Sequence, residues 1–489
     1  MKTRIICTIG PKSNSVDMLC KLLDAGMCIV RMNTAHGDFD YHQSIIDNTR
    51  AACRIKKTTC ALLLDIKGPE IRTGKLKPNP ARDDKKEWLL EKGTTITITT
   101  DLTQLGSNTL LATTYRNLPR ICKPGTKVLC ADGLIAFTVI STTDDTLQVK
   151  VENSGYVGEN KNMNVPGESI DLPAVTEKDK KFIEFGVRNE IDFIAASFIR
   201  KAADVIEVRN LPGVLEKGMQ IVSKIESQEG IDNFDSILEV TDAIMVARGD
   251  LGVEIPVEKI PGAQKTMIEK CNKAGIPVVT ATQMLESMVV NPRPSRAEIT
   301  DVFNAVIDGT DCVMLSGETA NGSYPVECVA TMANICRSAE ATIDYRSLFI
   351  KMRASCKPPI PIAESVASSA VKTSWDMGAG VIVAITETGK TARLISKYRP
   401  HCPIIAVTAN PLTARQIMIV RGGYPYLVSS LDQSSDRIIS SAAKKALRGG
   451  FVTENDYLTV ITGMLDSKSE FTNLMKVLRV SEVLPQYGY

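Results

Sequence analysis

Three side chains in the middle of the chain, Lys224, Glu226 and Asp250, combine a fixed positive charge with two carboxylates. Lys224 and Glu226 are separated by a single residue, so on a β-strand both would leave from the same face. Carboxylate oxygens suit a hard divalent cation, Mg2+ or Mn2+, and a neighbouring lysine can neutralise charge that develops on a transferred group. An ordinary buried ion pair between Lys224 and one of the acids explains the spacing equally well. The spacing alone leaves both interpretations open.

The segment that positions these residues, 221–254, has the pattern strand, helix, strand. An apolar run leads into Lys224, residues 231–238 are amphipathic, and a second apolar run, 243–247, ends at Arg248. The polar residues therefore gather at the carboxyl ends of the strands. In parallel α/β folds ligands bind there, because loops and helix N-termini converge at that edge.

The composition is that of a globular protein with roughly two to four domains. Hydrophobic residues make up 44% of the 489 residues, and a net charge of +2 with 5% aromatic residues disfavours nucleic-acid binding. No apolar run is long enough to span a membrane and no signal peptide is visible, so we expect no membrane association. The cysteine count is odd, 13, without a CxxC pair, which indicates free thiols and a cytoplasmic location.

Strands and helices alternate through residues 1–69 and 170–345. Eight apolar runs, each followed by a helical pattern, predict parallel strands covered on both faces. They lie at residues 4–10, 27–33, 60–66, 191–197, 219–226, 242–247, 276–282 and 311–318. Eight is the strand number of a closed (β/α)8 TIM barrel, and an open doubly wound sheet is the alternative.

Two further domains follow from changes in this pattern. Residues 70–169 carry short alternating runs split by turn residues, which predicts an antiparallel β domain inserted after the third barrel strand; the helices resume at Thr176, a predicted N-cap. After a proline-bearing linker, residues 346–489 predict a smaller three-layer α/β domain with four strands. One of its strand-to-helix loops could hold a phosphate, or could simply be a capped turn: Thr386, Thr388, Gly389, Lys390 and Thr391.

Eight strand-end motifs resemble those of the pyruvate kinase family. They are CTIGPKS (7–13), VRMNTAHG (30–37), LLDIKGPEIRTG (63–74), SKIES (223–227), MVARGDLGVEI (245–255), TATQMLESM (280–288), NPRPSRAE (291–298) and DGTDCVMLSGETANGSYP (308–325). They occur in the family's order and spacing, and the C-terminal domain is similar in layout. The inserted domain corresponds to the family's mobile β-barrel lid. Eight specific motifs in order favour a catalytic role for Lys224 over an ordinary ion pair.

The resemblance implies transfer of the phosphoryl group of phosphoenolpyruvate to ADP, then protonation of the enolate to pyruvate, the last step of glycolysis. The transition state is loose and anionic, so charge neutralisation and positioning supply the catalysis. By resemblance, Lys224 stabilises the transferring group, Arg31 clamps it, and Glu226 and Asp250 hold the Mg2+ (or Mn2+).

The resemblance also implies contacts with the rest of the substrate. The N–H groups of Gly249 and Asp250, at the start of a short helix, suit its carboxylate. Thr282 contacts the face on which the enolate is protonated. We expect Thr282, with Ser316 and Glu318 acting through water, to deliver the proton.

Nucleotide contacts are implied for residues of the barrel mouth and of the inserted domain: Asn33, His36, Arg72 and Lys161. Arg72 would bind phosphates through its bidentate guanidinium group. The alternative for His36 is a turn histidine satisfied by the backbone.

Asn33, Asp65 and the carbonyl of Ile66 are similar to the family's K+ ligands, and here the chain departs from the pattern. The family's motif Asn-Phe-Ser-His-Gly reads Asn-Thr-Ala-His-Gly at residues 33–37. Ala35 cannot coordinate a cation, so K+ would lose one oxygen unless water or Thr34 replaces it. Glu70 is the residue type of K+-requiring members. We therefore expect a K+ dependence, weakened by Ala35.

The C-terminal domain corresponds to the family's allosteric domain, and the oligomer, by resemblance, is a homotetramer. Residues 386–391 resemble the loop that grips a sugar phosphate in regulated members. Glu387 adds a negative charge to that loop, and the segment 463–472 has Lys468 as its only cation, which weakens a bisphosphate interpretation. We expect a sugar-phosphate or nucleotide effector, whose identity the sequence does not define.

Two other functions compete with this interpretation. A metal-dependent aldolase or lyase on the same barrel would need neither a β lid nor Lys224 at the phosphoryl position. A catalytically silent, effector-binding relative is favoured by Ala35 alone. Against it, the main expected catalytic side chains are all present.

Overall fold

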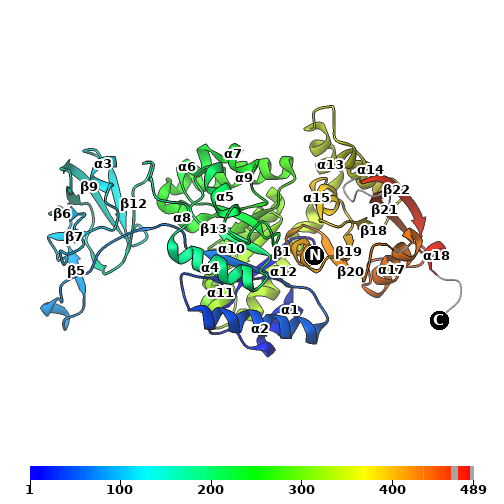
Figure 1. Cartoon of the computed structure of the whole chain (residues 1–489), viewed down its shortest axis with the longest axis horizontal. Coiled ribbons are helices and arrows are strands. Elements are labelled where there is room, and N and C mark those ends of the chain that lie inside the picture. The colour runs from blue at the N-terminus through cyan, green and yellow to red at the C-terminus, as the bar shows by residue number, and fades with distance from the viewer. Residues whose placement is uncertain (433, 464–471, 485–489) are drawn as a thin grey trace.

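The chain folds into three bodies in a row (Figure 1). The computed structural model describes residues 1–432, 434–463 and 472–484. The body inserted after β3 lies at one end, a barrel lies in the centre, and the C-terminal body lies at the other end.

The central body is a closed barrel of eight parallel strands, which confirms the predicted (β/α)8 fold. The strands run in the order β1-β17-β16-β15-β14-β13-β3-β2. Their bounds are β1 Arg4–Thr8, β2 Met27–Asn33, β3 Ala61–Ile66, β13 Phe193–Ala196, β14 Gln220–Ile225, β15 Ala243–Ala247, β16 Val278–Ala281 and β17 Cys312–Leu315. These strands are buried almost throughout, as expected for strands covered by a helix layer outside and packed side chains inside.

Helices surround the barrel, and several of them begin at a side-chain cap. They are α1 Val16–Ala25, α2 Phe39–Lys56, α4 Glu177–Arg188, α5 Ala202–Arg209, α6 Gln228–Asp232, α7 Phe234–Leu238, α8 Arg248–Glu254, α9 Ile260–Ala274, α10 Arg296–Asp308, α11 Gly317–Ala320 and α12 Pro325–Thr342. Thr176 is the N-cap of α4, as predicted, and the structure adds a reciprocal capping box with Asp179; Ser295 caps α10 in the same way with Glu298.

The inserted body lies between β3 and α4 and is mainly a curled sheet in the order β4-β12-β8-β9-β10-β6-β7, with a separate pair β11-β5. The bounds are β4 Ile71–Arg72, β5 Glu87–Leu90, β6 Thr95–Thr99, β7 Leu110–Ala112, β8 Lys127–Cys130, β9 Ile135–Thr142, β10 Thr146–Val151, β11 Gly155–Gly158 and β12 Asn162–Asn164, with α3 at Leu118–Ile121. One pair, β6 with β7, is parallel, so the sheet is mixed and not wholly antiparallel as expected. The long connection over residues 100–109 permits this crossover.

The C-terminal body is a mixed sheet between helices, with strand order β20-β19-β18-β21-β22. Its elements are α13 Tyr345–Ala354, α14 Ile362–Asp376, β18 Val381–Ile385, α15 Lys390–Lys397, β19 Ile404–Thr408, α16 Pro411–Gln416, β20 Gly423–Leu427, α17 Ser435–Arg448, β21 Tyr457–Gly463, β22 Thr472–Arg479 and α18 Val480–Val483. The antiparallel strand β22 was missing from the prediction. Most of the segment 463–472, including Lys468, lies outside the described residues.

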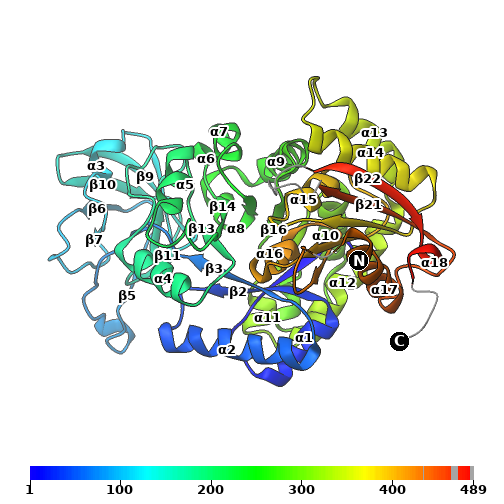
Figure 2. The ribbon, with the colours of Figure 1, turned by 45° about the vertical axis from the view of Figure 1, so that its right-hand side comes forward.

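The barrel and the C-terminal body share one hydrophobic core. Side chains from the barrel interior, such as Ile6, Leu63 and Met245, form one cluster with Ile417–Val420, which follow α16. Figure 2 shows the C-terminal body lying against the barrel. Within the described residues, no helix combines the length and hydropathy needed to cross a membrane.

Candidate active site

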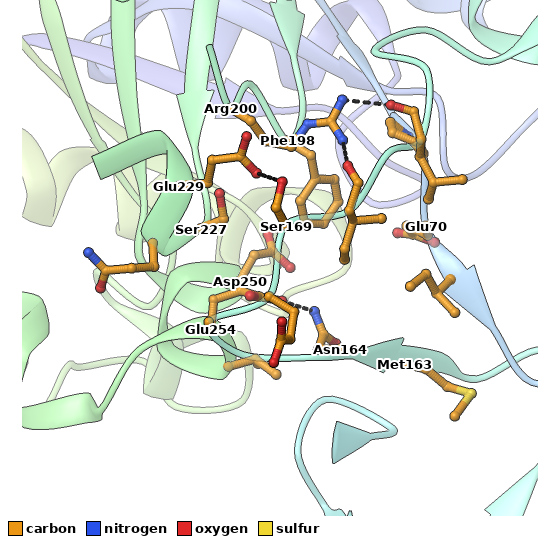
Figure 3. A pocket seen from close by; sticks show the side chains of 18 of the residues that line it. Glu70, Met163, Asn164, Ser169, Phe198, Arg200, Ser227, Glu229, Asp250 and Glu254 are labelled. Atoms are coloured by element: carbon orange, nitrogen blue, oxygen red, sulfur yellow. Dashed lines mark hydrogen bonds between the residues drawn. The ribbon is translucent and has the colours of Figure 1, made fainter. Parts of the chain in front are cut away.

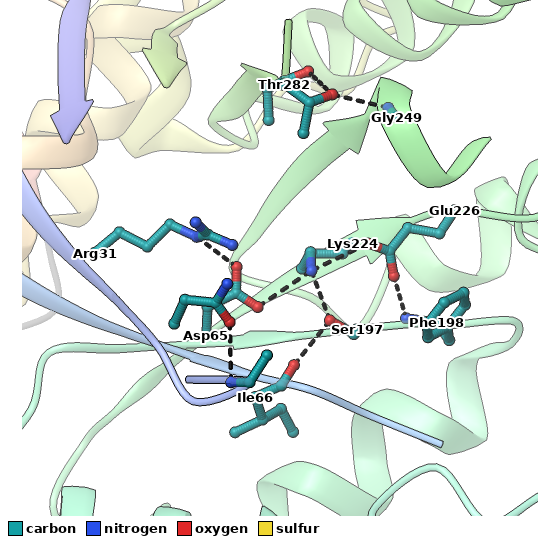
Figure 4. Close-up of polar contacts among 12 residues, drawn as sticks. Arg31, Asp65, Ile66, Ser197, Phe198, Lys224, Glu226, Gly249 and Thr282 are labelled. Carbon is teal, nitrogen blue, oxygen red and sulfur yellow. Dashed lines mark hydrogen bonds and ion pairs between the residues drawn. The ribbon is translucent and has the colours of Figure 1, made fainter. Parts of the chain in front are cut away.

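The ends of strands β2, β3 and β14 bring Arg31, Asp65 and Lys224 into one buried network (Figure 4). Lys224 Nζ lies 3.1 Å from Asp65 Oδ1 and 3.0 Å from Glu226 Oε1. Arg31 Nε donates to the other oxygen of Asp65 at 2.7 Å. Asp65 thus holds two cationic groups side by side, at a mouth where an anionic group would be neutralised by both.

Two residues that the sequence analysis did not single out complete this network. Lys224 Nζ donates to Ser197 Oγ at 2.6 Å, and Ser197 donates to the carbonyl of Ile66 at 2.8 Å. The next residue, Phe198, has a left-handed backbone (φ 54°) and donates its N–H to Glu226 Oε2 at 2.6 Å. A serine directly after an apolar strand was the available signal, but its partners lie far away in the chain.

Burial decides the charge states of this network. Burial raises the pKa of Glu226 to about 8, against the lowering effect of Lys224 and with a further raising effect of Asp250. Burial would lower the pKa of Lys224, but Asp65 and Glu226 outweigh it and raise the pKa of this lysine. For Asp65, burial is outweighed by Arg31 and Lys224, so its pKa is lowered. Lys224 is therefore a permanent positive charge.

The donor set fits a divalent cation. Glu226 is fully buried, and its Oε1, although 3.0 Å from Lys224 Nζ, accepts no hydrogen bond from any described residue, so this oxygen keeps a lone pair with which to bind a metal. Asp250 is exposed and lines a cavity of about 370 Å3 between the inserted body and the barrel, together with Phe198 and Glu254 (Figure 3). Among the described residues no group of three His, Cys, Asp or Glu side chains could hold a metal. A site with only two carboxylates still suits Mg2+, because this cation usually completes its shell with water and substrate oxygens.

Thr282 follows β16 and faces the start of α8. Its hydroxyl accepts from the Gly249 N–H at 2.8 Å and donates to the Ala281 carbonyl at 2.6 Å. Its backbone is left-handed, with φ 67°. Gly249 and Asp250 both lie in the first turn of α8, as expected.

Ser316 and Glu318 lie after β17, but their environments differ. Glu318 is fully buried, and its carboxylate accepts the N–H groups of Leu285 at 3.1 Å and Ser316 at 2.7 Å. Burial raises the pKa of Glu318. Ser316 instead lines a second cavity, of about 550 Å3, whose wall also includes Arg31, Asn33 and His36.

The expected nucleotide residues fall into two groups. Asn33 and His36 lie at the second cavity with Arg31. Arg72 and Lys161 lie on β4 and beside β12 of the inserted body, and neither is among the described residues that line this cavity. The guanidinium group of Arg72 is paired with Glu70.

The three expected K+ ligands lie close together, at the ends of β2 and β3. Asn33 Oδ1 accepts from the Ala35 N–H at 3.1 Å, and the Asp65 carbonyl accepts from the Thr34 hydroxyl at 3.0 Å. The Ile66 carbonyl already accepts from Ser197. Thr34, the neighbour of Ala35 in the chain, is fully buried, and its hydroxyl is already bound to the Asp65 carbonyl.

The candidate effector loop joins β18 to α15 and is closed internally. Thr386 Oγ1 accepts from the Gly389 N–H at 3.0 Å, and Gly389 needs its positive φ of 78°. The carbonyl of Glu387 accepts from Thr413 at 2.7 Å, while Thr388 and Lys390 are exposed. Thr391 is buried and shares a hydrogen bond with Thr472.

Comparison with known proteins identifies the family. A family model for the pyruvate kinase barrel domain matches residues 1–329, and one for the pyruvate kinase alpha/beta domain matches residues 364–478. A pyruvate kinase of Dictyostelium discoideum is 48% identical over 99% of this chain and 95% of its own length, and a cytosolic isozyme of Glycine max is 49% identical over 91% and 90%. The crystal structure of a pyruvate kinase from Cryptosporidium parvum superposes with a TM-score of 0.93 at 45% identity, covering 98% of this chain and 96% of that one. These matches agree with the closed barrel, the inserted sheet, the C-terminal body and the strand-end motifs. The chain therefore belongs to the pyruvate kinase family.

Proposed function

We propose that the chain transfers the phosphoryl group of phosphoenolpyruvate to ADP and then protonates the enolate to pyruvate, on the residues around Lys224. The observation that carries this proposal is the buried network in which Asp65 holds Arg31 and Lys224 side by side. In the reaction the bond from phosphorus to the enol oxygen breaks, a bond to the terminal oxygen of ADP forms, and the enolate carbon gains a proton. Both cationic groups would neutralise charge on the phosphoryl group as it moves.

The remaining residues orient the substrates. Glu226 and Asp250 would hold Mg2+ or Mn2+, which when bound supplies positive charge against the substrate's carboxylate and phosphate. We assign the substrate's carboxylate to the first turn of α8, at Gly249 and Asp250, and its reacting carbon to the side of Thr282. Thr282, with Ser316 acting through water, is the proposed route of the proton. The carboxylate of Glu318 is enclosed, so we assign it the role of holding Ser316 through its backbone N–H.

ADP would occupy the second cavity, beside Asn33 and His36, with Arg72 and Lys161 arriving from the inserted body. Arg31 lines this cavity and also contacts Asp65, so it can reach the phosphoryl group from the nucleotide side.

Replacing the central lysine tests the proposal. In an assay of pyruvate formation from phosphoenolpyruvate and ADP with Mg2+ and K+, we expect wild type to turn over and Lys224→Met to lose roughly 10³-fold or more, because the fixed charge is lost. Lys270→Met is the matched control, since Lys270 pairs with Asp235 at the surface and should keep wild-type activity. A wild type that is silent with every ion tried would favour the effector-binding alternative.

The monovalent cation gives an independent prediction. We propose that K+ binds Asn33, Asp65 and the Ile66 carbonyl, and that Ala35 weakens this site by removing one oxygen. Activity should therefore be higher in K+ than in tetramethylammonium buffer, and Ala35→Ser should lower the K+ concentration for half-activation several-fold. Equal rates in the two buffers would refute the K+ site.

Regulation, assembly and location are also proposed from the family. We propose a homotetramer in the cytoplasm, in line with relatives named cytosolic isozymes, and a sugar-phosphate or nucleotide effector at residues 386–391. Light scattering measures the oligomeric state, and titration of the activity with fructose 1,6-bisphosphate and nucleotides tests the effector site.

A further inference from the structure

The backbone after β16 is held in an unfavourable conformation. Thr282 and Gln283 both have left-handed backbones, with φ 67° and 53°. This conformation is rare for residues other than glycine, and a β-branched residue such as threonine is an outlier there. Such strain persists only where neighbouring groups enforce it, and it concentrates at functional sites.

One side chain, that of Arg248, binds the backbone of this segment. Its Nε donates to the carbonyl of Ala281 at 3.2 Å, and its Nη2 donates to those of Thr282 at 2.7 Å and Gln283 at 3.4 Å. A single guanidinium group therefore binds three successive carbonyls. The planar fork of arginine spreads its donors over several nitrogens and fits this row of carbonyls, whereas the donors of a lysine share one nitrogen and fit it poorly.

Arg248 is itself oriented from the opposite side. Its Nη1 donates to Asp301 Oδ1 on α10 at 2.7 Å and lies 3.4 Å from Gln264 Oε1 on α9. The Arg248 side chain is 10% exposed, so these contacts are largely shielded from water. Two helices outside the barrel thus fix the guanidinium plane.

The same clamp reaches the site through the neighbouring residue. Arg248 is the first residue of α8, and the N–H of Gly249 donates to the Thr282 hydroxyl. The end of β16 and the first turn of α8 are therefore joined twice, once through the guanidinium group and once through this hydroxyl. Their junction carries both Thr282 and Asp250.

We propose that Arg248, oriented by Asp301, is a positioning residue that sets the Thr282 hydroxyl against the enolate carbon. The inference rests on the proposed function. Arg248 does not itself touch the substrate, because its donors are directed at the Ala281, Thr282 and Gln283 carbonyls, at Asp301, and at the sulfur of Met284. Loss of the clamp should therefore impair protonation through Thr282 and leave substrate binding largely intact.

A double-mutant cycle between Arg248→Lys and Thr282→Ala tests this coupling. The readouts are kcat, the KM for phosphoenolpyruvate, and the exchange of pyruvate methyl protons with D2O followed by NMR in the presence of Mg2+, K+ and ATP. We expect Arg248→Lys to slow exchange and kcat about tenfold or more, with the KM changed less than about threefold. Adding Arg248→Lys to Thr282→Ala should cause little further loss, because both act through one hydroxyl.

Arg209→Lys is the matched control. Arg209 also binds a carbonyl, that of Val240 at 2.9 Å, and an aspartate, Asp242 at 2.8 Å, but away from Thr282. The Arg209→Lys variant should leave proton exchange unchanged, and its effects on kcat should add independently to those of Thr282→Ala. Asp301→Asn, which keeps an oxygen acceptor, should give a smaller loss that is likewise coupled to Thr282.

Independent, additive effects of Arg248→Lys and Thr282→Ala would overturn the inference, as would an Arg248→Lys enzyme with wild-type exchange. Either result, obtained with an active wild type and an inactive Lys224→Met, would leave the proposed function standing. An inactive wild type would instead remove the proposed function itself.

Discussion

Lys224 carries a charge that its surroundings do not allow it to lose. Asp65, Ser197 and Glu226 surround its ammonium group at 3.1, 2.6 and 3.0 Å. Its pKa is raised by the two carboxylates in spite of burial. Lys224 is therefore unsuited to deliver a proton near neutral pH and suited to act as a fixed charge, which agrees with phosphoryl transfer as its role and leaves protonation to another group.

The sequence is sufficient to predict the charged members of the site but not the residues that orient them. Lys224, Glu226 and Asp250 are visible because strand periodicity and strand ends place them together. Ser197 and Arg248 were missed, since their partners lie on other strands and the contacts form only when the barrel closes. For Glu318 the sequence predicts a role through water, and the structure adds what no pattern shows, that its oxygens accept two backbone N–H groups.

Glu226 leads to a pH prediction for metal binding. Because burial raises its pKa to about 8, a proton must leave Glu226 before a cation binds at lower pH. The Mn2+ affinity should therefore rise up to about tenfold per pH unit below about pH 8 and level off above it, with proton release during binding. Titration calorimetry in buffers of different ionisation enthalpy measures both quantities.

Glu226→Gln is the control for this experiment, because it keeps the shape and removes the titrating group. It should bind Mn2+ more weakly and without this pH dependence. A flat wild-type affinity across the same range would contradict the prediction.

The inserted sheet is joined to the barrel by two linkers, and the second is pinned from both sides. Arg200, which follows β13, donates to the carbonyls of Ile170 and Leu172. Between them, Asp171 accepts from Asn117 at 3.0 Å and from Tyr115, both in the inserted body.

The sequence predicts the insertion and its strands from alternation and turns, but a hinge held by backbone carbonyls leaves no pattern in the side chains. The parallel pairing of β7 and the strand β22 were missed for a related reason, since pairing partners are set by tertiary contacts.

Arg200→Lys should loosen this hinge, because two separate guanidinium nitrogens bind the carbonyls of Ile170 and Leu172, and a single ammonium nitrogen would replace them. Arg72 and Lys161 lie on the inserted body, so we expect the KM for ADP to rise several-fold and the KM for phosphoenolpyruvate to change less. Amide hydrogen exchange of residues 168–172 should become faster. Arg209→Lys serves again as the control. If Arg200→Lys exchanges faster but keeps the wild-type KM for ADP, the hinge does not affect nucleotide binding and the prediction is wrong.

The C-terminal body closes the base of the barrel, opposite the mouth that carries the site. Residues 417–420 pack against the barrel interior, and the polar rim of this junction includes Arg415, whose Nε donates to Asp192 at 2.6 Å. The second oxygen of Asp192 accepts the Leu62 N–H at 2.8 Å, at the start of the strand that carries Asp65. Hydrophobic periodicity predicts that both bodies exist, but it says nothing of which surfaces meet, because the joining side chains are short apolar or charged residues found in any core or rim.

Arg415→Gln tests how much this junction depends on charge. Asp192 is fully buried, and burial raises its pKa to about 6 despite Arg415. A carboxyl group with a raised pKa contributes stability that is complete below its unfolded pKa and is lost as the pH rises through about 6. Without Arg415 the lone charge costs more at high pH, so the variant should lose roughly 3 kcal/mol of unfolding free energy at pH 8 and clearly less near pH 5, where Asp192 is protonated.

Lys270→Gln, which removes an exposed ion pair with Asp235, should lose at most about 0.5 kcal/mol at either pH. Urea unfolding of both variants at the two pH values decides: an Arg415→Gln loss of equal size at both would show that the arginine acts by packing, whereas a loss that shrinks in acid would show that neutralising Asp192 is what joins the two bodies.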